Sequence, residues 1–169
     1  MTTLTVLDQG QAISLSFEDL VKYHGRSSIA GLAQAFKAME RAFQLLCPDG
    51  PPERDDLTVE SGFPGGGARD GFEMVTRAVT GDRYQLASEP PSVEAPEAPG
   101  GRFFFRLGYR GTVVELVLRA DLVPDDFLDV ACRDTPTPAE AERARELKEA
   151  MAERILGLPA AEVFDAALR

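Results

Sequence analysis

The chain has 169 residues, and its 28 Asp and Glu against 18 Lys and Arg give a formal net charge of −10. Nucleic-acid-binding proteins need a basic face that neutralises phosphates, and anionic membranes attract basic segments, so this charge disfavours both partners. The length suits a single core, and we predict one domain over residues 1–169.

The N-terminal stretch "MTTLTVLDQG" has neither a basic region nor an apolar run of signal-peptide length. No segment approaches the ~20 apolar residues of a membrane-spanning helix. We therefore expect a cytoplasmic protein. In that reducing compartment Cys47 and Cys132 are expected to be buried or free thiols, although the sequence leaves a disulfide between them open.

Two helices are expected first. Ser16 with Asp19 three residues later is typical of a capping box, which predicts a short helix from Phe17 to about Tyr23, ending at Gly25. A longer helix follows, because apolar residues recur at spacings of three and four. Its stripe consists of Ile29, Leu32, Phe36, Met39, Phe43 and Leu46. Interleaved alanines keep its flanks thin, so the stripe is interpreted as core, with packing on a second copy as the alternative.

The middle of the chain favours strands. Alternation in "LTVES" predicts a strand at 57–61, and "DRYQLAS" predicts a short strand after a glycine-rich turn and a helix from about Arg69 to Val79. Residues 88–101 are rich in proline and glutamate with almost nothing to bury, which indicates a loop or disordered insertion.

Residues 102–122 predict a hairpin that turns near Arg110 and Gly111. Phe103, Phe105 and Leu107 alternate on one face, and the expected register places Val113, Glu115 and Val117 beside them. Phe104, between the first two, indicates that both faces of the sheet are at least partly covered.

The last third favours helices. Thr137 as N-cap, Pro138 in the first turn and Glu140 begin a helix whose alternating Glu and Arg mark a solvated face. "LPAAEVFDAAL" predicts a final short helix. Helices, then strands, then charged helices together predict an α+β fold, with helices packed on a mixed or antiparallel sheet.

Few residues offer chemistry. The turn "GFPGGGARDG" follows a strand and precedes a helix, as anion-binding loops do, but it lacks the Lys-Ser/Thr of a P-loop, so a simple bend is the default. His24 is the only histidine; Ser27 and Ser28 are near it, but no nucleophile elbow is present. One histidine and two distant cysteines are a poor set of zinc ligands.

Three blocks, in order, resemble the FmdE family of formylmethanofuran dehydrogenase subunits. "SFEDLVKYHGRSSIAGLAQAFKAMERAFQLL" is similar to its aromatic-His-Gly-His-x-Cys-Pro-Gly stretch and helix, and "LTVESGFPGGGARDGFEMVTRAVTGDRYQL" to its strand, Cys-Gly-Val-Asp-Ala segment and helix. "ERILGLPAAEVFDA" resembles its C-terminal Leu/Pro-x-x-Glu-Leu-Phe block. The resemblance implies an α+β fold, usually as a homodimer.

The chain departs from the family at its metal-binding positions. The second histidine falls on Arg26, one cysteine on or near Ser28 and another near Gly67. Because arginine, serine and glycine are not transition-metal ligands, the family's metal site looks dismantled. His24 and Asp70 are the remaining candidates for a divalent metal such as zinc.

Three functions follow from the resemblance. One is a non-catalytic accessory protein that binds a small polar ligand; the others are a metal-binding component of a redox or one-carbon enzyme, and a structural protein that acts as a dimer. Whether the chain is an enzyme stays open, and no catalytic residue is assigned. The candidate ligand-binding residues are His24, Arg26, Ser28, Gly66, Gly67, Arg69 and Asp70.

Overall fold

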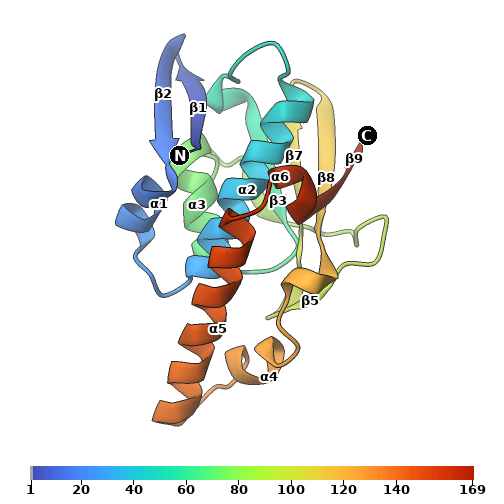
Figure 1. Ribbon diagram of the computed structural model, residues 1–169. Coiled ribbons are helices and arrows are strands. Elements are labelled where there is room, and N and C mark those ends of the chain that lie inside the picture. Colours follow the sequence, from blue (N-terminus) through green and yellow to red (C-terminus); the bar gives the residue numbers. More distant parts are fainter. Residues whose placement is uncertain (1) are drawn as a thin grey trace.

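Helices pack against a mixed five-stranded sheet in the computed structural model, which describes residues 2–169 (Figure 1). The helices are α1 (Phe17–His24), α2 (Ile29–Leu46), α3 (Gly66–Thr76), α4 (Phe127–Ala131), α5 (Pro138–Leu156) and α6 (Ala160–Val163). The strands are β1 (Thr3–Asp8), β2 (Gln11–Ser16), β3 (Leu57–Ser61), β4 (Tyr84–Leu86), β5 (Glu97–Ala98), β6 (Gly101–Arg102), β7 (Phe104–Tyr109), β8 (Thr112–Leu118) and β9 (Phe164–Leu168).

The main sheet has the strand order β4-β3-β7-β8-β9. β3 and β4 run parallel, and the other neighbours are antiparallel, so the expected α+β fold with a mixed sheet is confirmed. β7 and β8 form the expected hairpin. Its turn has Arg110 and Gly111 at positive φ, 48° and 91°, as a tight hairpin turn requires.

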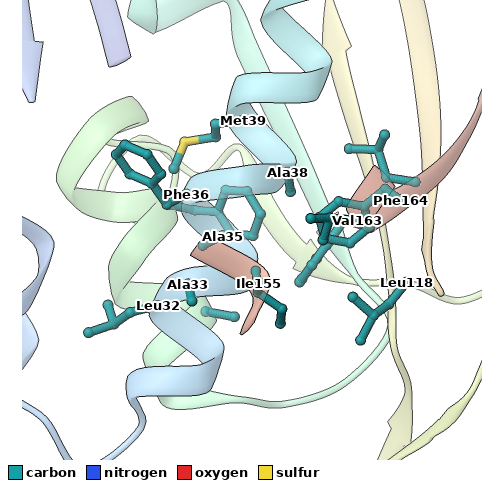
Figure 2. Close-up of a cluster of buried hydrophobic side chains, with 14 of the residues drawn as sticks. Leu32, Ala33, Ala35, Phe36, Ala38, Met39, Leu118, Ile155, Val163 and Phe164 are labelled. Carbon is teal, nitrogen blue, oxygen red and sulfur yellow. The ribbon is translucent and has the colours of Figure 1, made fainter. Parts of the chain in front are cut away.

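α2 lies at the centre of the molecule, between α3, α5 and the sheet (Figure 1). Ile29, Leu32, Phe36 and Met39 are buried, which confirms the core interpretation of the stripe. Figure 2 shows Ala38 facing the β8 and β9 side of the core, where Leu118 and Phe164 lie. The thin alanine flanks therefore serve close packing within one chain.

Both ends of the chain differ from the sequence prediction. Residues 3–16, for which no structure was expected, form the antiparallel hairpin of β1 and β2. The C-terminal segment forms only the four-residue α6 before it becomes β9, which pairs with β8. The final helix was therefore predicted too long, because pairing at the open edge of β8 outweighs the helix propensity of the alanines.

α3 begins and ends three residues earlier than predicted. It begins at Gly66 because the glycine-rich segment packs directly against α2, and it ends at Thr76 because Arg77 adopts a left-handed conformation with φ 57°. The Glu73 carboxylate then accepts hydrogen bonds from the backbone N–H groups of Val79 and Thr80. These bonds hold the following turn outside the helix.

The predicted register between the hairpin strands was wrong by one residue. Phe105 pairs with Leu116 and Arg106 with Glu115, so Phe105 faces the helices while Glu115 lies on the opposite face. The alternation in β8 is ambiguous, because its hydrophobic residues occupy both faces and both faces are covered.

The outer face of the sheet is covered by the proline-rich segment. Phe104, Val117 and Ala95 form a small buried cluster there, and β5 lies within the same segment and pairs with β6 at its end. Residues 88–96 form neither helix nor strand, β5 occupies Glu97–Ala98, and β6 begins at Gly101. The segment has few apolar side chains to bury. It is nevertheless held on the sheet, because buried charged side chains on β7 and β8 form hydrogen bonds with its backbone.

Two further expectations concern the whole chain. Cys47 and Cys132 are free thiols, so no disulfide joins them. None of the helices in residues 2–169 is both long enough and apolar enough to cross a membrane.

Candidate functional site

The structure joins His24 and Asp70, the two residues that the resemblance marks as surviving metal ligands. His24 is the last residue of α1 and Asp70 lies in the first half of α3, and His24 Nδ1 is 2.7 Å from Asp70 Oδ2. The Arg69 guanidinium lies 3.2 Å from Asp70 Oδ1. His24 Cε1 would lie 3.9 Å from a Cβ atom on Gly66, so the ring approaches the start of α3.

This pair has the geometry of a tether, by which we mean a hydrogen bond that joins the end of α1 to the first half of α3. Its carboxylate is already shared by His24 and Arg69, and His24 Nε2 is buried without a hydrogen-bond partner among the described residues. Neither His24 nor Asp70 lines the neighbouring cavity at the start of α2, so that cavity offers no space for a ligand beside this nitrogen. The pair therefore orients the start of α3 more readily than it binds a ligand.

We expect His24→Ala to lower the free energy of unfolding by about 1–2 kcal/mol, because it removes a partly buried hydrogen bond to a carboxylate. Urea unfolding of the purified variant measures this. Arg69→Ala is the matched control, since Arg69 is half exposed and its contact with Asp70 should contribute less than about 1 kcal/mol. Equal losses in both variants would contradict the tether.

The residues present do not fit a metal centre of the family type. Within residues 2–169, no group of three or more His, Cys, Asp or Glu side chains could hold a metal ion. His24 and Asp70 supply two donors that are bonded to each other, whereas a zinc site uses three or four ligands. This pair alone is therefore too small a ligand set for the zinc centre that the resemblance implies.

The N-termini of α2 and α3 meet beside this pair. A Cβ atom on Gly31 of α2 would lie 2.9 Å from the backbone nitrogen of Ala68 in α3, and one on Gly67 would overlap the backbone of Ser28. Only residues without a side chain allow this approach. The glycine-rich turn is thus explained by helix packing, and its end forms one wall of a cavity.

That cavity has a volume of about 200 Å³ and lies between the start of α2, the 63–67 segment, α4 and α5. Its walls are largely apolar, with three aromatic rings from Phe63, Phe103 and Phe127. Two of the predicted site residues, Ser28 and Gly67, line it, whereas His24 and Asp70 do not.

The cavity is also lined by two polar side chains that the sequence did not single out. Gln34 is 1% exposed, and its Oε1 has no hydrogen-bond partner within residues 2–169. Lys148 of α5 also lines the cavity, and its Nζ donates to the backbone carbonyl of Ser27 over 3.3 Å. The sequence could have identified Gln34 as a candidate, because it is a polar residue among alanines on a buried helix. It could not have identified Lys148, which lies among the alternating charges of α5.

Arg26 lies in a different place. It lines a separate groove together with Ser27 and with Arg145 and Glu149 of α5. Lys148 lines both that groove and the cavity. The predicted site residues are therefore divided among three neighbouring places: the His24–Asp70 pair with Gly66 and Arg69, the cavity wall with Ser28 and Gly67, and the groove with Arg26.

A wider groove of about 550 Å³ runs between β1 and the end of α2, with Phe43 and Cys47 in its wall. It contains none of the predicted site residues. Burial raises the pKa of the Cys47 thiol, so this group stays protonated at neutral pH and is a poor nucleophile. We therefore take the smaller cavity at the start of α2 as the candidate site.

No protein-family model matches this chain, and no curated protein matches it. The assignment to the FmdE family therefore stays a prediction. The proposal of a function rests on the geometry of the cavity.

Proposed function

We propose that this chain binds a small, largely apolar organic molecule in the cavity between α2, α4 and α5. The observation that carries the proposal is the Gln34 amide, which is buried in a largely apolar wall with Oε1 unpartnered. Leaving a buried acceptor unpaired costs about 1–3 kcal/mol. A ligand that donates an N–H or O–H group would recover this energy, whereas a purely structural cavity would favour an apolar side chain there.

The resemblance to the FmdE family fits the same proposal. Ser28 and Gly67 stand on or near the positions of the family's cysteines, and both line the cavity. In an accessory protein of this kind, residues that line a pocket for an organic molecule would have replaced the residues that bind a metal in the family. The homodimer that the resemblance implies is part of the proposal, and sedimentation equilibrium measures it independently.

The cavity volume sets the size of the test probe. A dry cavity of about 150 Å³ accommodates benzene, so about 200 Å³ suits a substituted benzene. 4-Methylphenol and toluene form a matched pair, because they differ only in the hydroxyl group that can donate to Gln34. We expect 4-methylphenol to raise the melting temperature more than toluene does, since a ligand that binds only the folded state stabilises it.

Gln34→Met keeps the side-chain length and removes the amide. We expect this variant to be at least as stable as wild type without ligand, because the unpaired acceptor is gone, and to lose the preference for 4-methylphenol over toluene. Gln44→Met is the control, since Gln44 is exposed on the same helix and outside the cavity. Failure of both probes to bind wild type, by melting and by NMR shifts of cavity residues, would contradict the proposal.

His24→Ala separates this proposal from a ligand site centred on His24. Because His24 does not line the cavity, the variant should lose stability yet bind 4-methylphenol with unchanged affinity. Loss of binding in this variant, after correction for its stability, would instead favour the site implied by the resemblance.

A further inference from the structure

We infer that the cavity takes an anion, a small aryl or branched-alkyl carboxylate whose apolar body lies among the phenylalanines and whose acid group lies at the Lys148 end. This inference rests on the proposed function and goes beyond it, because the geometry of the cavity alone would equally accept a neutral molecule.

The charge around the cavity favours an anion. The chain has a net charge of −10, yet among the described residues that line the cavity none is Asp or Glu, and Lys148 is the one charged group. The Lys148 ammonium group has three N–H donors, and the Ser27 carbonyl uses one of them. The remaining donors are free to bind a carboxylate oxygen.

Two helix N-termini at the cavity favour an anion as well. Ser28 and Gly65, the N-cap residues of α2 and α3, line the cavity, and neither gives a side-chain cap in the described structure. Neither first turn contains an acidic residue, whereas α1 and α5 each have a complete capping box with an acidic side chain. The N–H groups and the positive end of the dipole at α2 and α3 therefore remain available to an anion.

Gln34 is an independent observation on the same cavity. Its amide is buried beyond the helix ends, in the second turn of α2, and its Oε1 lacks a partner. A helix end alone is often solvated, but solvation does not explain a fully buried unpaired acceptor in the wall. Together these groups describe a ligand with an acid group at one end and a donor along its body.

The number of positive groups limits the ligand charge. The Lys148 ammonium group contributes one positive charge and each of the two helix termini contributes roughly half of one, so the ligand can carry one or two negative charges. The largely apolar wall with three phenylalanine rings favours a carboxylate with an apolar body over a phosphate. The volume of about 200 Å³ restricts the body to about the size of a substituted benzene. A carboxylate of this size satisfies both limits.

The test uses 4-hydroxybenzoate and 4-hydroxybenzamide, which share shape and a phenolic O–H that can donate to Gln34 but differ in the charge of the group at the other end, titrated into the full chain by calorimetry at neutral pH and low salt. We expect wild type to bind the benzoate at least tenfold more tightly than the benzamide. Raising the salt concentration should weaken only the benzoate, because salt screens the charge attraction.

Lys148→Met should lower benzoate affinity about tenfold and leave benzamide affinity unchanged. Lys22→Met is the matched control, since Lys22 is exposed on α1 and outside the cavity, and it should change neither. Melting curves check that both variants are folded, and Lys148→Gln replaces the methionine variant if that one melts early.

Each outcome has a distinct meaning. Equal binding of benzoate and benzamide, or benzoate binding that Lys148→Met and salt leave unchanged, would overturn the anion inference while the proposed function stands. Binding of 4-methylphenol without any binding of the benzoate would do the same. Failure of every probe would overturn the proposed function together with the inference.

Discussion

Arg106→Met is expected to lower the free energy of unfolding by about 3–5 kcal/mol, since removing the buried cation of an ion pair leaves the buried Glu115 charge with only the exposed end of Arg169 as a charged partner. Arg106 and Glu115 lie opposite each other on β7 and β8, both buried, with Arg106 Nε 3.0 Å from Glu115 Oε2. The methionine would leave the Glu115 carboxylate in place and remove its buried cation, with Arg169, 2.9 Å away and partly exposed, remaining.

The same guanidinium holds the proline-rich segment on the outer face of the sheet. It donates to the backbone carbonyls of Glu89 and Pro90, at 3.1 and 2.6 Å, and Glu115 in turn accepts hydrogen bonds from the backbone and hydroxyl of Ser92. Arg169, at the end of the chain, adds a contact to Glu115 of 2.9 Å. The network therefore connects four separate parts of the sequence.

Urea unfolding and limited proteolysis measure the two consequences. A glutamate-specific protease should cut the folded variant at Glu94 faster than it cuts wild type, because the segment loses its anchors. Arg119→Met is the control, since Arg119 is half exposed and its contact with Asp165 should contribute at most about 1 kcal/mol. Arg106→Met with Glu115→Leu should be more stable than Arg106→Met alone. A loss no larger than that of Arg119→Met would contradict the prediction.

The effect should also depend on pH. Burial opposes ionisation of Glu115, but hydrogen bonds from Ser92 and Arg106 and the charge of Arg169 outweigh it, so the pKa of this carboxyl is lowered from its usual 4.5. A lowered folded-state pKa gives stability that is complete above the unfolded pKa and is lost as pH falls through the folded value. The stability gap between wild type and Arg106→Met should therefore shrink below about pH 4.

Phe105→Ala is expected to cost about 3–5 kcal/mol, the range for removing a buried phenylalanine ring. Phe105 is the neighbour of Arg106 on β7 but points to the helix side, where it is 0% exposed. Its ring centroid is 5.0 Å from that of Phe72 on α3 and 6.1 Å from that of Phe164 on β9. The alanine would leave a cavity where α3 and the last strand meet the sheet.

Phe43→Ala is the matched control, because Phe43 is only partly buried at the end of α2 and should cost less than half as much. Chemical denaturation with unchanged m-values would show that both variants unfold from the same native state. A Phe105→Ala loss equal to that of Phe43→Ala would mean that β7 does not form the centre of the core.

The candidate site was only partly predictable from the sequence. The contact of His24 with Asp70 follows from a resemblance rather than from spacing, and whether either residue binds a ligand stays a prediction. Ser28 and Gly67 were named for their place in a motif, yet it is the close approach of two helices that brings them to the cavity. Gln34 and Lys148 come from helices far apart in the chain, and no local pattern relates them.

By itself the sequence determined the elements with strong local signals. The capping residues at Ser16 and Thr137, the apolar period of α2 and the turn at Gly111 all act within a few neighbouring residues, and the structure confirms each. Tertiary structure alone decided the hairpin register, the strand at the C-terminus and the contacts of the 88–101 segment with the sheet. These features depend on which surface an already formed sheet offers for pairing, and that surface is assembled from distant parts of the chain.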